Sequence, residues 1–122
     1  MRLTRKVDGN SISLLEGTNT IFTMKETRED MCMVVTLEGS MKSDVEYDFK
    51  DEMMMLIFCG LDLKLDFSKV DYLSPSCARV LLYIQQEIDK RERGSLVLSK
   101  MPIAILKELE STGLSELLMI ED

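Results

Sequence analysis

The serine hydroxyls in DYLSPSCARVLLY (71–83) are the groups in this sequence most suited to regulatory chemistry. Ser74 and Ser76 flank Pro75, and an apolar run with helical spacing follows. A serine before a proline is typical of a helix start, with Ser74 as N-cap and Pro75 at the first helical position, where a missing N–H costs nothing. Helix chemistry alone therefore explains the pattern, and the remnant of a regulatory switch is the second interpretation.

Catalytic and metal-binding groups are sparse. The chain has 122 residues and no histidine, which is the commonest general acid–base and metal ligand. Cys32, Cys59 and Cys77 show no C-x-x-C spacing, so a zinc site would need an unusual ligand set. We interpret all three as small buried apolar residues in a reducing cytosol. We therefore expect a protein that is not an enzyme and that has no metal and no cofactor.

The overall charge and hydropathy argue against several partner classes. The net charge is −7, so a broad surface for nucleic acid or an anionic membrane is not expected. The longest apolar run, MMMLIFC at 53–59, is far shorter than the ~20 residues of a membrane span, and the N-terminus lacks a signal-peptide segment. The methionines of this run predict either core packing or a methionine-rich partner surface. We expect a cytoplasmic protein without membrane insertion.

Strand and helix patterns alternate along the chain. The stretch 61–68 alternates strictly between apolar and polar residues, which is typical of a strand with one covered face. The stretch 31–39 is nearly continuously apolar, as expected of a strand covered on both faces. In 40–60, apolar residues recur at spacings of three and four, which predicts a helix with Ser43 or Asp44 as N-cap. The remaining predicted elements are strands at 20–27 and 95–99 and helices at 75–92 and 102–113.

This order, β-β-α-β-α-β-α, predicts an α/β fold with right-handed crossovers. We expect a mixed sheet of four to five strands with helices mainly on one face, because 61–68 has only one apolar face. Residues 20–122 would form this domain. Residues 1–19 are interpreted as an N-terminal extension, either an extra hairpin that turns at Asp8-Gly9 or an ordered arm.

Four segments in one order resemble the STAS domain, the fold of bacterial anti-sigma factor antagonists. They are VVTLEGSM, LDFSKVDYLS, CARVLLYIQQEIDKRERGSLVLS and ILKELESTGLSELLMI. The first resembles the family's Leu-x-Gly-x-Leu strand, the second its Asp-Leu-Ser-x-Val strand, and the last its closing Leu-x-x-x-Gly-Leu-x-x-Leu segment. The resemblance covers residues 20–120 and implies a STAS-like fold.

The resemblance also implies a phosphorylation switch, from which this sequence departs. Members of the family carry a serine in the loop before the second helix, and a partner kinase that is also the anti-sigma factor phosphorylates it. Here Ser74 stands where the family has the residue before that serine. Pro75 stands where the family has the phosphorylated serine itself, and Cys77 stands where glycine is usual. Proline has no hydroxyl to phosphorylate. Either phosphorylation has moved to Ser74 or Ser76, or the switch is lost; we favour its loss.

The implied function is non-catalytic regulation of another protein, such as a serine-kinase-like anti-sigma factor, in bacterial signalling and transcription regulation. The alternative is an accessory or sensor domain that binds a nucleotide or a lipid, for example with a transporter. A monomer or weak homodimer would serve either function. The residues implied in partner binding are Met41, Lys42, Ser43, Asp44, Ser74, Pro75, Ser76, Cys77 and Arg79.

Overall fold

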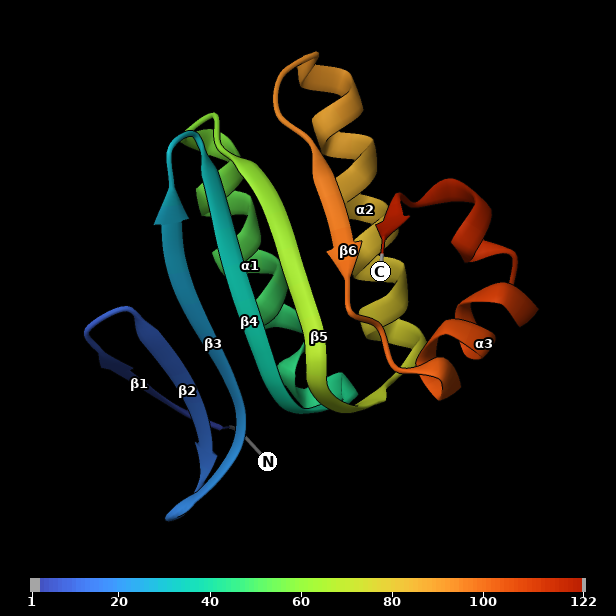
Figure 1. Ribbon diagram of the computed structural model, residues 1–122. Helices are drawn as coiled ribbons and strands as arrows, with labels where there is room; N and C mark the ends of the chain where they lie inside the picture. The colour runs from blue at the N-terminus through green and yellow to red at the C-terminus, as the bar shows by residue number, and fades with distance from the viewer. Residues whose placement is uncertain (1–2, 122) are drawn as a thin grey trace.

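Seven strands and three α-helices form two layers in the computed structural model, which describes residues 3–121 (Figure 1). Residues 1 and 2, which begin the expected N-terminal extension, and residue 122, which ends the expected domain, lie outside the described residues. In chain order the elements are β1 (Thr4–Asp8), β2 (Ser11–Glu16), β3 (Asn19–Glu29), β4 (Cys32–Met41), the 3-10 turn η1 (Ser43–Val45), α1 (Glu46–Phe58), β5 (Asp62–Leu73), α2 (Pro75–Arg91), β6 (Leu96–Ser99), α3 (Ile103–Ser111), the 3-10 turn η2 (Leu114–Leu117) and β7 (Ile120–Glu121).

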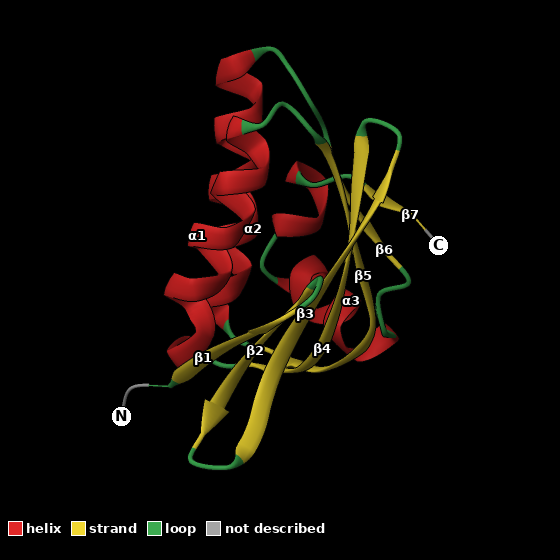
Figure 2. Ribbon diagram, turned by 90° about the vertical axis from the view of Figure 1, so that its left-hand side faces the viewer, coloured by secondary structure: helices red, strands yellow, loops and turns green. Residues whose placement is uncertain are grey.

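The sheet keeps the order of the sequence, from β1 at one edge to β7 at the other. Strands β1 to β4 pair antiparallel, whereas β4 to β7 pair parallel. Helices follow β4, β5 and β6 and lie on one face of the sheet, as Figure 2 shows edge-on. This confirms the α/β class, the mixed sheet and the one-sided helical layer. The sheet has seven strands instead of four to five, because residues 4–16 supply a hairpin that joins β3 and the end of the chain adds β7.

The one-sided helical layer corrects two expectations about burial. In β4, Val35 and Leu37 are fully buried, but Val34 and Thr36 on the opposite face are only half-buried. The apolar run of this strand is therefore covered on one face, and not on both. Of the three cysteines expected to be buried, Cys77 is buried, Cys32 is half-buried and Cys59 is exposed at the end of α1.

The first helix begins later than the apolar spacing predicts. Ser40 and Met41 extend β4, because they pair with Tyr72 and Leu73 of β5, and the Ser40 hydroxyl donates to Asp71 Oδ1 at 2.5 Å. The 3-10 turn then precedes Glu46, and α1 has no side-chain cap hydrogen bond. The predicted N-cap at Ser43 or Asp44 is therefore wrong, since strand pairing outweighs the local helix pattern.

The hydrophobic core lies between the sheet and the helical layer. Phe22 of β3 and Phe49 of α1 meet edge to face, with ring centroids 6.3 Å apart and an interplanar angle of 84°. This is a favourable aromatic geometry. Met53 of α1 is fully buried, while Met55 is exposed. The first of these methionines therefore serves core packing.

Gly39 allows β4 to lie close against β3. It pairs with Phe22 and has a φ of 109°, which side chains of L-residues rarely adopt. A Cβ atom at this position would overlap the backbone carbonyl oxygen of Ile21. The close approach of the two strands therefore requires glycine in the VVTLEGSM segment.

We expect Gly39→Ala to lower the free energy of unfolding by about 1–3 kcal/mol from backbone strain alone, with the overlap on Ile21 adding to the loss. Gly17→Ala is the matched control, because Gly17 also has a positive φ of 63° but has open space where a Cβ would lie. Its loss should be about 1 kcal/mol. Urea denaturation measures both, and equal losses would contradict the role assigned to Gly39.

Candidate functional site

The ends of β4 and β5 bring two loops together at one edge of the sheet. The strands are parallel and in register at Met41 and Leu73, their last residues. The backbone N–H of Ser74 donates to the carbonyl of Met41 at 2.8 Å, and the Cys77 thiol donates to the carbonyl of Lys42 at 3.4 Å. The segment after β4 and the start of α2 are therefore held side by side, although they are more than thirty residues apart in the sequence.

The start of α2 has the capping geometry that the sequence predicts. Ser74 is extended, with φ −71° and ψ 156°, and Pro75 is the first helical residue. The Ser74 hydroxyl accepts a hydrogen bond from the backbone N–H of Cys77 at 3.2 Å and lies 3.2 Å from the hydroxyl of Ser76. Only 5% of Ser74 is exposed. Its hydroxyl is therefore committed to the helix start, and the predicted N-cap is confirmed.

The nine residues implied in partner binding differ in exposure. Met41, Ser74 and Cys77 are buried, so they position the loops without reaching a docked molecule. Burial raises the pKa of the Cys77 thiol, so this group stays protonated and is a poor nucleophile. Ser76 is half-buried, and the exposed residues are Lys42, Ser43, Asp44, Pro75 and Arg79.

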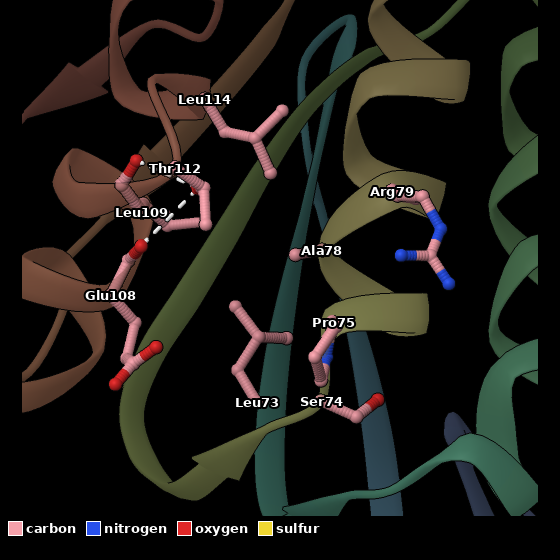
Figure 3. A pocket seen from close by; sticks show the side chains of 9 residues that line it. All are labelled: Leu73, Ser74, Pro75, Ala78, Arg79, Glu108, Leu109, Thr112 and Leu114. Carbon is pink, nitrogen blue, oxygen red and sulfur yellow. Dashed lines mark hydrogen bonds between the residues drawn. The ribbon is translucent and has the colours of Figure 1, made fainter.

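An apolar hollow of about 240 Å³ lies on one side of Pro75, between α2 and α3 (Figure 3). Leu73, Ala78, Leu109 and Leu114 contribute to its walls. The side chain of Arg79 points away from these leucines. Sequence reasoning did not include Leu109 and Leu114 in the site, because they are distant in the chain and only the packing of α3 places them beside α2.

A second, shallow groove also borders Pro75. It is lined by Lys42 and Ser43 from the segment after β4, by Tyr72, and by Ser74, Ser76 and Arg79. The groove thus has two cationic side chains, in a chain whose net charge is −7. Tyr72 is 48% exposed and was not predicted as a site residue, although it occupies an outward position in β5 directly before Leu73. Pro75 therefore forms a ridge between the apolar hollow and a groove with two cationic side chains.

The described residues were found to contain neither a metal-binding group nor a membrane-crossing helix. Among residues 3–121, no group of three or more acidic, cysteine or histidine side chains is placed to hold a metal ion. No helix within this range combines the length and the apolar character needed to cross a membrane.

The sequence matches the family described as Mlab, STAS domain, over residues 24–121. No curated protein matches it. The structure resembles the anti-sigma factor antagonist SpoIIAA in its unphosphorylated form, with a TM-score of 0.68 and 16% identity over 81% of this chain and 88% of that chain. It also resembles the Bacillus SpoIIAA in the phosphorylated form, with a TM-score of 0.63 and 16% identity over 81% of this chain and 91% of that chain. For an anti-sigma factor antagonist from Mycobacterium paratuberculosis the TM-score is 0.70 and the identity is 19%, over 81% of this chain and 84% of that chain. These structural similarities establish the fold.

Proposed function

This chain belongs to the STAS domain family, and from that premise we propose that it is a non-catalytic regulatory module that acts in the cytoplasm by docking on another protein. The docking surface consists of the segment Lys42–Asp44 and the start of α2, Ser74–Arg79. The observation that carries the proposal is the exposed ridge of Pro75, which β4–β5 pairing places between a cationic groove and an apolar hollow.

The two depressions indicate what a docked partner would contribute. The hollow is smaller than the ~300–1,000 Å³ of typical ligand pockets, and its walls are mainly apolar, so one large apolar side chain of a protein suits it. The groove presents Lys42 and Arg79, which favour acidic groups on the partner. Proteins with the same fold are anti-sigma factor antagonists. The partner class that we propose is therefore an anti-sigma factor of the serine-kinase type.

We propose further that the usual phosphoserine switch is absent from this loop. Pro75 occupies the place of the acceptor and has no hydroxyl or N–H. The Ser74 hydroxyl is buried and caps α2, and a phosphate there would break the cap. Ser76 is half-buried, and its hydroxyl lies 3.2 Å from that of Ser74. Docking would then depend on the amount of each protein and not on a phosphate.

The protein isolated from its own cells should carry no phosphate at Ser74 or Ser76. Phosphopeptide mass spectrometry and intact mass measure this directly. The Pro75→Ser variant, treated with the partner and ATP, is the positive control for an acceptor at the usual place. A phosphate on Ser76 of the natural protein would contradict the loss of the switch and would favour its displacement by one residue.

Once a partner has been captured and purified, Pro75→Glu should weaken its binding at least about tenfold, which corresponds to about 1.4 kcal/mol. The charge would lie on the ridge and would be desolvated on docking. Ile103→Glu is the matched control, because Ile103 is the first residue of α3 and is 71% exposed away from both depressions. Both variants place a carboxylate at a helix N-terminus, where it is tolerated. Equal affinities in calorimetric titration would refute this docking surface.

The apolar hollow also favours a second candidate function, a sensor domain that holds one part of a hydrophobic ligand. If a lipid is the ligand, short-chain lysolipids should raise the melting temperature in a concentration-dependent way, and Leu114→Asp should abolish the rise. Nucleotides serve as the comparison set, because an apolar hollow offers little to a phosphate. No shift with any of these compounds would leave protein docking as the function of the hollow.

A further inference from the structure

A buried carboxyl oxygen lies between the N-terminal hairpin and α1. Glu26 is on the side of β3 that faces the helices, in line with the buried residues Phe22 and Met24. Its Oε2 atom is buried and has no hydrogen-bond partner among the described residues. Glu26 as a whole is half-buried, but its ionisation would be unfavourable at Oε2, because this oxygen has lost water and has gained no donor. The position of the Glu26 carboxyl group therefore needs a physical explanation.

The neighbouring charged group on α1 is also a carboxylate. Glu52 is buried, and its Oε1 atom lies 3.1 Å from Nη2 of Arg5, which comes from β1. All five residues of β1 are exposed, so this ion pair is a side-chain connection between an otherwise superficial strand and the helical layer. The cluster thus joins three elements: β1 through Arg5, α1 through Glu52 and β3 through Glu26.

The charges in this cluster do not balance when both carboxyl groups are ionised. Glu52 and Arg5 are the charged groups that act on Glu26. The facing residue of β4 is Val35, which is apolar, and the Asn10 amide before β2 donates to the Glu26 backbone carbonyl at 2.8 Å. Arg28, next on the same face of β3, donates its Nε hydrogen to the carbonyl of Asp30. Two carboxylates would therefore face a single guanidinium.

We infer that Glu26 and Glu52 share one proton, and that this proton and Arg5 form a latch that holds the edge strand β1 against α1, whereas Ile12 and Leu14 fix β2 in the core. With the proton on Glu26, its O–H donates to the carboxylate of Glu52, which also accepts from Arg5. The buried oxygen then has a partner, and the cluster has one negative and one positive charge. The latch lies at the opposite edge of the helical layer from the α2–α3 hollow, so it does not rest on the proposed docking function.

The acid–base behaviour of Glu26 supports this arrangement. Burial, followed by the hydrogen bond that protonated Glu26 makes to Glu52 and by the charge of Glu52, raises the pKa of Glu26 from 4.5 to about 8, against the opposing effect of Arg5. The folded protein thus retains a proton that the unfolded chain has lost above pH 4.5. The stabilisation by the latch is complete below pH 4.5 and declines as the pH rises to about 8. Ionisation above that range would loosen β1 from α1.

The first test is an NMR titration of the side-chain carboxyl carbons in the natural protein. Glu26 should titrate close to pH 8 instead of 4.5. Glu52→Gln should lower its pKa, because a neighbouring negative charge is lost, and Arg5→Gln should raise it, because a positive charge is lost. Glu38→Gln is the control, since Glu38 is exposed and pairs with Lys69. Titration of Glu26 near pH 4.5 would refute the shared proton, whether or not the variants fold.

The second test follows β1 by amide hydrogen exchange, corrected for intrinsic rates. Between about pH 6 and about pH 9, protection of β1 amides should fall at least about tenfold relative to β5 amides, the equivalent of one pKa unit. In Glu26→Gln the amide can donate to Glu52 at any pH, so this relative loss should disappear. A loss of the same size in Glu26→Gln, or no loss in the natural protein, would refute the latch.

Discussion

The parallel pairing of β4 and β5 is the constraint on which the candidate site depends. Backbone hydrogen bonds continue along these strands until Met41 lies beside Leu73, and the bond from Ser74 N–H to the Met41 carbonyl closes the pair. Because both chains leave the sheet at the same edge, the segment after β4 and the start of α2 must adjoin. The helix α1 between them has no freedom to separate these loops, since its own apolar side packs on the sheet.

This constraint decides which side chains are free to act. Serine is favoured at helix starts because the first backbone N–H groups of a helix lack partners. The Ser74 hydroxyl accepts a hydrogen bond from one of these groups, and Ser74 is buried in doing so. Pro75 then lies outermost, where it needs no donor, and its rigid ring makes the ridge between the two depressions. A residue that stabilises the helix start and a residue available to a partner are thus neighbours with different tasks. The arrangement supports docking more directly than it supports chemistry on a hydroxyl.

The edge strand β1 and the proposed docking surface are stabilised in different ways. The proposed docking surface is backed by backbone pairing and by a fully buried core, which do not change with pH. The strand β1 is exposed along its whole length and is connected to α1 by a polar cluster instead of apolar packing. Polar clusters of this kind depend on a complete set of partners, so a single proton has a large effect on them. The N-terminal part of the sheet is therefore the part most open to modulation.

Local sequence patterns by themselves determined the elements whose causes lie within a few residues. These include the N-cap at Ser74, the proline at the first turn of α2 and the one-sided alternation of β5. Local patterns did not reveal the extension of β4 through Met41, the exposure of Cys59 or the hollow that Leu114 completes. Each of these depends on a partner distant in the chain, such as Asp71 for Ser40 or α3 for α2. Tertiary structure alone also placed Glu26 beside Glu52, because only packing decides which charges share a buried site.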